Sequence, residues 1–226
     1  MSYQKKSFKE NFKIEIEKLK KMSFKDKMWY IKEYYGIHIF LTIIVLLIFS
    51  SLAFSMLKKD PAFNAVFLNK PINSTSYDKM YSEFYEYAKF KDTNDDWELK
   101  PNVSVILKDN EIVNGLEYLA KINAMIASQT LDTLITEEYF INHFASQDIL
   151  LNLEESLPSD LLEKFKNNLY YVEGINGEKK AYALDISDSP IIKESVYVAG
   201  PVYFSILSNS KNLDNSILFL KYLYNM

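Results

Sequence analysis

The distribution of apolar and charged side chains divides the chain into three parts. Residues 37–57, IHIFLTIIVLLIFSSLAFSML, contain no charged side chain, and a helix of this length crosses a hydrocarbon core of ~30 Å. A buried helix of a soluble protein would share the pattern. However, fourteen Leu, Ile, Val and Phe residues in the segment favour the bilayer by roughly 4–8 kcal/mol. We therefore expect a transmembrane helix over residues 37–57.

The charges on the two sides of this segment predict its orientation. Residues 1–36 contain ten Lys and five acidic residues, whereas residues 58–226 contain sixteen Lys and twenty-five acidic residues. Lys residues close to a span stay in the cytoplasm, so we expect a cytoplasmic N-terminus and a domain outside the bacterial plasma membrane. The charged region is too long for a cleaved signal peptide. An uncleaved signal anchor fits better.

The N-terminal segment, residues 1–36, is predicted to be helical and basic. Apolar residues recur at helical spacing over residues 8–19, and the capping pair Ser23 and Asp26 predicts a second helix that begins near Phe24. Two interpretations remain open. The segment is either an amphipathic helix that lies on anionic lipid or on a partner, or a solvated helix that only fixes the topology.

Beyond the span, strand and helix patterns alternate. Capping signals, including Thr75 with Asp78, and apolar periodicity mark the helices. The expected strands are 63–68, 103–107, 131–136, 169–172, 180–186 and 202–207. One expected helix begins at Thr75. The other expected helices cover 111–128, 137–146, 160–168 and 213–224. Strands joined by helices predict crossover connections. We therefore expect a one-lobe, three-layer α/β domain with a mainly parallel sheet over residues 58–226.

The composition argues against most catalytic chemistry. The chain has no Cys and no Arg, two His and five scattered Gly, so thiolate sites, bidentate anion clamps and phosphate-cradling loops are not expected. The acidic C-terminal part also lacks the basic footprint that nucleic acids require. We therefore expect no enzyme activity, no cofactor and no nucleic-acid partner. The absence of Arg beside abundant Lys, Asn and Ile is typical of an AT-rich bacterial genome.

One loop carries part of a calcium-binding pattern. Asp92, Asn94 and Asp96 occupy positions 1, 3 and 5 of such a loop, which are oxygen-ligand positions. Trp97 stands at position 6, where Gly makes the sharp turn, and Val103 stands at position 12, where a bidentate Glu belongs. An Asx-rich turn is therefore the better interpretation, and no metal is expected.

Three stretches carry a resemblance to a known family. They are residues 131–158, with a strand, a helix and a Leu-Pro segment; residues 177–184, GEKKAYAL; and residues 208–212, SNSKN, before the last helix. In these stretches the chain resembles extracytoplasmic solute-binding proteins of ABC transporters, specifically the carbohydrate group with the type II periplasmic-binding fold. The 169 residues after the span hold about one of the two lobes of that family. The resemblance therefore implies a fold and a cell-surface setting, but it transfers no carbohydrate contacts.

Two functional classes follow. The first is an accessory protein that binds another membrane protein, such as a transporter, or itself, with the lipid bilayer as its other partner. The alternative is a binding protein for a small, carbohydrate-like solute, held where open α/β sheets bind ligands, at the carboxyl ends of parallel strands. The candidate contacts there are Asn69, Asp109, Asn110, Thr136, Glu137 and Tyr139.

Overall fold

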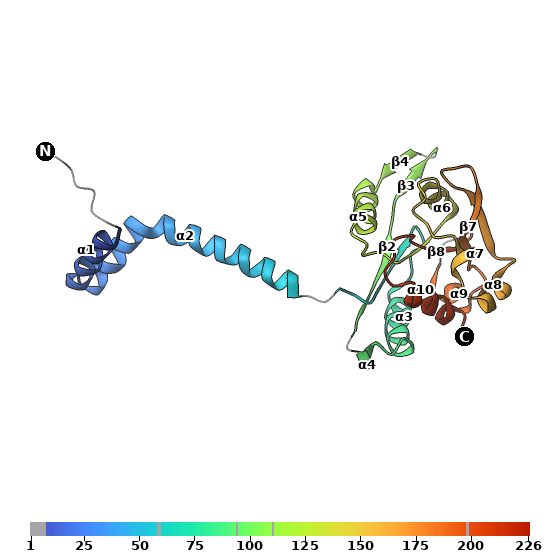
Figure 1. The fold of residues 1–226 in the computed structure, drawn as a ribbon, viewed down its shortest axis with the longest axis horizontal. Helices are drawn as coiled ribbons and strands as arrows, with labels where there is room; N and C mark the ends of the chain where they lie inside the picture. Colours follow the sequence, from blue (N-terminus) through green and yellow to red (C-terminus); the bar gives the residue numbers. More distant parts are fainter. Residues whose placement is uncertain (1–7, 58–59, 94, 110, 198) are drawn as a thin grey trace. The chain divides into compact units, whose positions relative to one another are not determined.

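The chain forms two compact units, Met1–Lys59 and Asp60–Met226. A computed structural model describes residues 8–57, 60–93, 95–109, 111–197 and 199–226. The first unit consists of α1 (Phe8–Lys21) and α2 (Phe24–Leu57). The second unit contains a central sheet with helices around it (Figure 1). A mixed α/β unit preceded by one N-terminal apolar helix is therefore confirmed.

Helix α2 joins two segments that the sequence pattern treats separately. The expected capping pair forms at its start, because the Asp26 backbone N–H donates to Ser23 Oγ over 3.3 Å and Ser23 Oγ donates to the Asp26 carboxylate over 2.6 Å. The helix then continues without interruption through the apolar segment to Leu57. Within it, Phe24–Ser51 is long and apolar enough to cross a membrane, and none of its most apolar part is buried.

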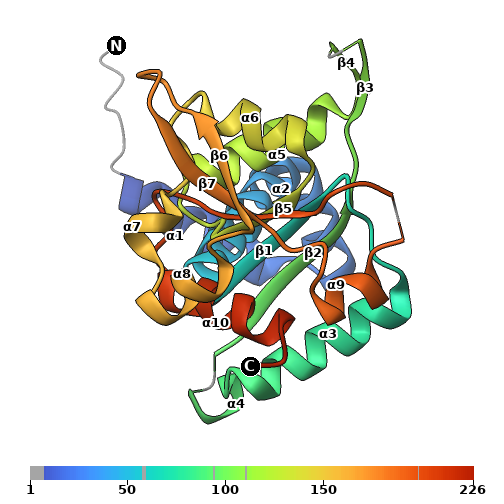
Figure 2. The same ribbon diagram turned by 90° about the vertical axis from the view of Figure 1, so that its right-hand side faces the viewer.

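The second unit is built on a six-stranded sheet with strand order β2-β1-β5-β8-β7-β6. Strand β1 pairs in parallel with β2 and with β5, whereas β5–β8, β8–β7 and β7–β6 are antiparallel pairs (Figure 2). The sheet is therefore mixed, with a parallel part, β2-β1-β5, and antiparallel pairs from β5 to β6, whereas the sequence pattern predicts a mainly parallel sheet. The strands are β1 (Phe63–Leu68), β2 (Trp97–Val103), β5 (Thr133–Thr136), β6 (Leu169–Glu173), β7 (Lys179–Asp185) and β8 (Tyr203–Ile206).

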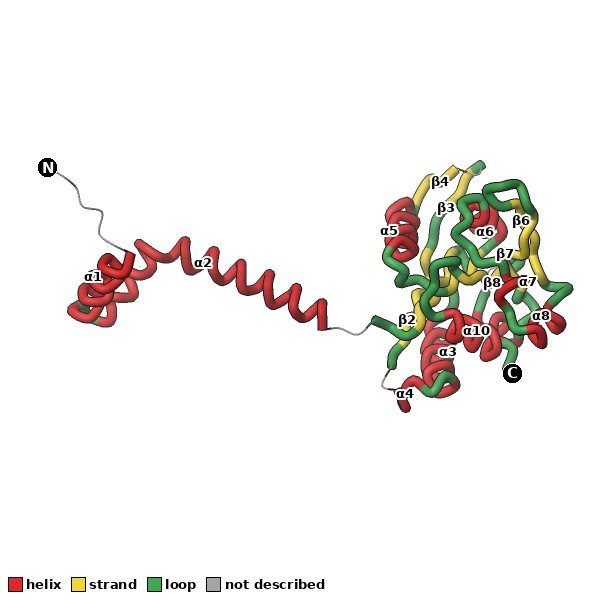
Figure 3. Tube along the Cα trace, viewed as in Figure 1, coloured by secondary structure: helices red, strands yellow, loops and turns green. Residues whose placement is uncertain are grey.

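The helices of the second unit flank this sheet (Figure 3). Helix α3 begins one residue before the expected Thr75, because its cap is Asn73, whose side chain accepts from the Ser76 backbone N–H. The helices are α3 (Ser74–Tyr87), α4 (Phe90–Thr93), α5 (Leu116–Ala127), α6 (Glu138–Ala145), α7 (Leu153–Ser156), α8 (Ser159–Phe165), α9 (Pro190–Ser195) and α10 (Leu213–Leu223).

The largest departure from the expected elements lies between β2 and α5. The sequence pattern predicts a strand over 103–107 and a helix from 111, whereas the structure has an antiparallel hairpin of β3 (Ile106–Lys108) and β4 (Glu111–Asn114). The β-branched pair Ile112 and Val113 favours extended backbone. Gly115, with φ of +87°, then ends the strand in a conformation that few other residues adopt.

Two hydrophobic clusters lie on the two faces of the sheet. Successive side chains of a strand point to opposite faces, and β1 follows this rule: Phe63 and Phe67 join one cluster, and Val66 and Leu68 join the other. The first cluster contains buried residues of α3, α8, α9 and α10, and the second contains those of α5 and α6. Strand β1 is fully buried because helices cover both of its faces.

Candidate functional site

Asn69 organises the carboxyl end of the parallel strands. It follows β1 directly and has φ of +56°, a left-handed conformation that Asn tolerates better than most residues. Its Oδ1 accepts from the Val105 backbone N–H over 2.7 Å, and its Nδ2 donates to the Val105 carbonyl over 2.8 Å and to Glu137 Oε1 over 2.7 Å. Asn69 therefore joins the segments that follow β1, β2 and β5.

A hollow of about 400 Å³ opens beside Asn69, which is within the size range of small-molecule sites. It is lined by Asn69, Pro71, Asn102, Val103, Ser104, Val105, Glu137 and Tyr197. The Asn102 side-chain oxygen accepts from the Ile72 backbone N–H over 3.0 Å, and its amide hydrogens make no hydrogen bond to the residues that the structure describes. Within the described part of the chain, Ser104 Oγ, Glu137 Oε2 and the Tyr197 hydroxyl also make no hydrogen bond.

Lys70 lies behind this hollow. Its side chain is almost fully buried, with 2 % exposure, and Nζ donates to the carbonyls of Ala199 and Gly200 over 3.3 and 3.4 Å. Burial lowers the pKa of Lys70, while the charges of Glu137 and Asp185 act in the opposite direction. The Lys70 charge therefore contributes to the electrostatics of the site without lining the hollow.

The structure brings some of the sequence-predicted residues together and separates others. Asn69, Thr136 and Glu137 lie at adjoining ends of β1 and β5. Thr136 is fully buried, and its hydroxyl has no partner among the described residues. Asp109 lies in the β3–β4 turn with φ of +51°, in the two-stranded sheet rather than at the end of the large one. Asn110 lies outside the described residues.

Tyr139, the sixth predicted residue, is on the first turn of α6 and is half-buried. Its ring packs at 5.0 Å from Phe140 and stacks on His143 with centroids 6.3 Å apart. His143 is partly buried in this packing, and the burial lowers the pKa of its imidazole. Tyr139 is therefore part of the packing of α6, and it does not line the hollow.

Sequence patterns miss three polar residues that line the hollow: Asn102, Ser104 and Tyr197. Asn102 and Ser104 are missed because the sequence pattern predicts a strand that begins at residue 103, whereas β2 ends there. Both residues therefore lie at the carboxyl end of β2. Tyr197 comes from the connection between α9 and β8, far along the chain, and only the tertiary fold brings it to β1. Tyr197 is 67 % exposed, so it lies at the solvent-exposed edge of the hollow.

A second hollow of about 280 Å³ lies next to the first and shares Asn102 and Val103 with it. The shared residues lie at the end of β2, the edge strand of the sheet. The lining is more apolar, with Lys100 and Lys121 at its margin; it consists of Val66, Leu99, Lys100, Pro101, Asn102, Val103, Tyr118, Lys121, Ile122 and Met125. Pro101 removes a backbone donor from this edge, which protects the strand from pairing with another strand.

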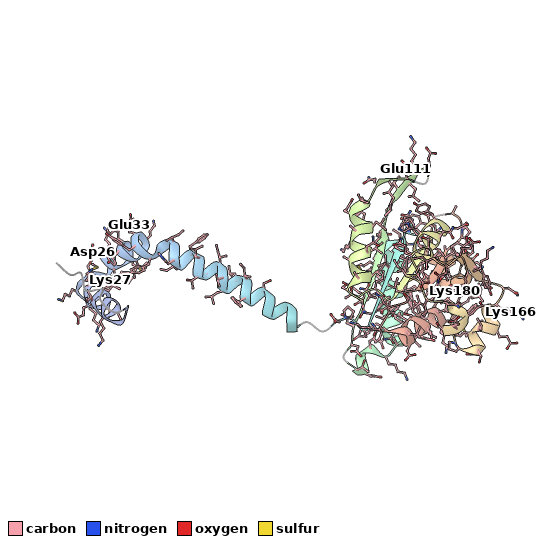
Figure 4. All side chains as sticks on the ribbon, turned by 45° about the horizontal axis from the view of Figure 1, so that its top comes forward. Asp26, Lys27, Glu33, Glu111, Lys166 and Lys180 are labelled. Atoms are coloured by element: carbon pink, nitrogen blue, oxygen red, sulfur yellow. The ribbon has the colours of Figure 1, made fainter. Side chains whose placement is uncertain are left out.

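Apolar side chains also gather on the β3–β4 hairpin and the start of α5. We name Ile106, Val113, Leu116 and Tyr118 the hairpin patch; all four are exposed. The hairpin and the start of α5 adjoin in the chain at Gly115, which packs tightly on Ser104 and Val105: a Cβ at Gly115 would lie 2.5 Å from the Ser104 carbonyl oxygen. Charged residues occur in the same elements, namely Lys108 in β3, Glu117 in α5 and Glu111 at the outer end of the hairpin (Figure 4).

Of the three residues in the calcium-binding pattern, one lies in a helix, one lies outside the described residues, and one forms hydrogen bonds within the protein. Asp92 is in α4, and Asn94 lies outside the described residues. Asp96 Oδ1 accepts from the Tyr81 hydroxyl and from the Trp97 backbone N–H, both over 2.8 Å. Across the described residues, no group of three or more His, Cys, Asp or Glu could hold a metal ion.

In comparisons with known proteins, the chain matches no family model, no curated protein and no solved structure. The resemblance to solute-binding proteins therefore stays an expectation from three stretches of sequence. The function has to be inferred from the residues and geometry of the chain itself.

Proposed function

We propose that the chain is a single-pass, membrane-anchored accessory protein of a bacterial plasma membrane, whose α/β unit binds another membrane protein or a second copy of itself outside the cell. The observation that carries this proposal is the hairpin patch. Large apolar side chains that are exposed on neighbouring elements, with charged residues among them, are typical of protein–protein interaction sites. In this chain the patch includes Val113 and Leu116, which are 58 % and 65 % exposed.

The membrane part of the proposal rests on α2. At 1.5 Å per residue its 34 residues extend for about 51 Å, which exceeds the hydrocarbon core by roughly 20 Å. The excess corresponds to the N-terminal part of α2, where Trp29, Tyr34 and Tyr35 are exposed and suit the aromatic belt of a bilayer interface. Asp26, Lys27 and Glu33 lie on this same part (Figure 4). The Lys excess of residues 1–36 supports a cytoplasmic location for that end.

For the second unit we propose a one-lobe, three-layer arrangement related to the first lobe of solute-binding proteins. Two hydrophobic clusters, one on each face of the sheet, support three layers. The alternation of β1, α3, β2, α5, β5 and α6, with α4 and the β3–β4 hairpin as additions, supports the kinship. A single lobe leaves any solute open to water, where polar contacts gain little over hydration. This argues for an accessory role rather than carbohydrate uptake.

Solute binding remains a second candidate function because one observation favours it. The hollow at the carboxyl ends of β1, β2 and β5 presents polar atoms that form no hydrogen bond with the described residues: the Asn102 amide nitrogen, Ser104 Oγ, Glu137 Oε2 and the Tyr197 hydroxyl. Asn69, by contrast, uses its side-chain amide within the protein. A solute would therefore be held by Glu137 and the residues that sequence patterns miss.

Site-specific photo-crosslinking tests the accessory role. A photoreactive amino acid at Val113 of the full-length protein in its native membrane should give a crosslinked product of defined mass. The same group at Ile175, which is 66 % exposed in the β6–β7 turn, is the matched control and should give none. The mass of the product distinguishes a second copy from another protein. Equal crosslinking at the two positions, or none at either, would contradict the proposal.

Substitution of Leu116 tests the same surface without a crosslinker. Leu116→Glu places a charge in the middle of the patch, and we expect at least a tenfold weaker association in mild detergent, equivalent to about 1.4 kcal/mol. Ile175→Glu, with nearly the same exposure as Leu116, should leave association unchanged. The readout is the mass of the purified full-length complex by light scattering.

A further inference from the structure

We propose that the hollow at the carboxyl ends of β1, β2 and β5 binds a small solute through a primary ammonium group, which the Glu137 carboxylate holds. This inference deepens the second candidate function and rests on it. The hollow has an ordered wall, because Asn69 ties Glu137 to the segment that follows β2 through three hydrogen bonds of 2.7 to 2.8 Å.

Among the described residues, Glu137 is the only carboxylate that lines the hollow. Its Oε1 accepts from Asn69 Nδ2 over 2.7 Å, which fixes the orientation of the carboxylate before any ligand arrives. Its Oε2 accepts no hydrogen bond from the residues described. A pre-oriented carboxylate with one free oxygen suits an N⁺–H donor, because charge-assisted hydrogen bonds are about twice as strong as neutral ones.

The nearest cation does not occupy that oxygen. Lys70 directs its Nζ to the carbonyls of Ala199 and Gly200, and it forms no ion pair with Glu137 within the described part of the chain. Lys70 attracts Glu137 only through longer-range electrostatics. Because its side chain is buried and does not line the hollow, the charged group that a solute contacts there is the Glu137 carboxylate.

The other lining residues indicate which chemical groups the solute carries besides its ammonium group. The exposed ring of Tyr197 offers a cation–π surface beside the carboxylate. The Asn102 amide and the Ser104 hydroxyl offer hydrogen bonds to a hydroxyl or carbonyl group of the solute, and Pro71, Val103 and Val105 offer apolar contact. The chemical class is therefore a short aliphatic amine that also carries a polar oxygen group.

Other ligand classes fit this lining less well. An anion would meet Glu137 and no lining cation. An uncharged sugar would cover the carboxylate without neutralising it, and the desolvation of an ion that lacks an ionic partner is costly. An ammonium group compensates that cost, so the structure selects for a positive charge.

Ligand-observed NMR on the full-length protein in lipid nanodiscs tests the proposal. The two probes are 5-amino-1-pentanol and 1,5-pentanediol, which have the same length and differ only in an ammonium in place of a hydroxyl group. At pH 7 we expect the amine to bind at least tenfold more tightly than the diol. In Glu137→Gln this preference should fall below threefold, while the melting temperature stays unchanged because the amide oxygen still accepts from Asn69.

Glu138→Gln is the matched control. Glu138 is the next residue in the chain and is exposed, and its carboxylate accepts from the Tyr170 hydroxyl over 2.8 Å, outside the hollow. This variant should keep the full preference for the amine. Equal binding of amine and diol, with both weakened by Asn102→Ala, would overturn the ammonium proposal but leave solute binding intact. Absence of binding by either probe would overturn both, and a preference that persists in Glu137→Gln would contradict the role of Glu137.

Discussion

At the scale of single residues, polar side chains hold both ends of the parallel strands. Asn69 does so at the carboxyl ends. At the amino ends, Asp132 is almost fully buried and accepts from the Asn64 backbone N–H over 2.9 Å, from Ser210 Oγ over 2.6 Å and from Asn212 Nδ2 over 3.2 Å. Residues 208–212, which carry part of the family resemblance, therefore have a structural role in this chain.

Substitution of Asp132 should be among the most destabilising single changes in the second unit. Asp132→Asn keeps the shape but turns an acceptor into a donor that faces the donors of Ser210 and Asn212. We expect a loss of about 2–3 kcal/mol in the free energy of unfolding, the typical cost of unsatisfied buried groups. Chemical denaturation of the full-length protein measures it. Asp160→Asn, at an exposed position in the first turn of α8, should change stability by less than about 0.5 kcal/mol.

Alkaline pH should destabilise the second unit through its buried tyrosines. Burial, followed by donation to Asp148 over 2.9 Å, raises the pKa of Tyr182 to about 12, against about 10 in an unfolded chain. Below pH 10 both states are protonated and the contribution of Tyr182 is complete. Between pH 10 and about 12 the unfolded state alone loses the proton, so stability falls.

The Tyr182→Phe variant isolates this contribution. Its free energy of unfolding should decline less steeply between pH 10 and 12 than that of the original protein, although it starts lower because the hydrogen bond to Asp148 is lost. Denaturation curves at several pH values give the two slopes. Identical slopes would show that Tyr182 does not carry the effect.

At the scale of elements, the sequence pattern predicts those helices and strands whose limits depend on local conformational preferences. The strand 63–68 coincides with β1, and the strands expected over 169–172 and 180–186 form the β6–β7 hairpin, in whose turn Gly177 has φ of +74°. The β3–β4 hairpin could not be predicted in this way, because residues 111–128 have helical apolar spacing throughout. Only the contact of Gly115 with Ser104 and Val105 decides where the strand ends.

Gly115 should therefore tolerate substitution less than Gly177 does. Both have positive φ, but a Cβ at Gly115 would lie 2.5 Å from a backbone oxygen, whereas a Cβ at Gly177 meets nothing within 4 Å. Gly177→Ala should cost about 1–2 kcal/mol, the strain of the left-handed conformation, and Gly115→Ala should cost clearly more. Thermal unfolding of the two variants compares them. An equal cost would mean that the hairpin adapts freely to the added methyl group.

At the same scale, the candidate site was only partly predictable. Asn69, Thr136 and Glu137 follow from the rule that parallel strands end on one edge. Asp109 does not, because the strand before it belongs to a separate two-stranded sheet. Tyr197 joins the lining from a distant connection, and no periodicity or spacing in the sequence links it to β1.

At the scale of the whole molecule, the proposals depend on the function of α2. The stretch Phe24–Ser51 is apolar and unburied, and a signal sequence near the N-terminus would share these properties. The two interpretations differ in what they predict for the mature protein. An anchor keeps residues 1–36 covalently joined to the α/β unit, whereas a cleaved signal separates them.

Protease accessibility on intact protoplasts tests the proposed topology most directly, with one epitope tag at each end of the full-length protein. We predict that untreated cells contain a single product with both tags. External protease should remove the C-terminal tag and leave an N-terminal fragment that contains residues 1–36, because the Lys excess holds this end in the cytoplasm. Protection of the C-terminal tag, or loss of the N-terminal tag without protease, would contradict the anchored, outward-facing arrangement.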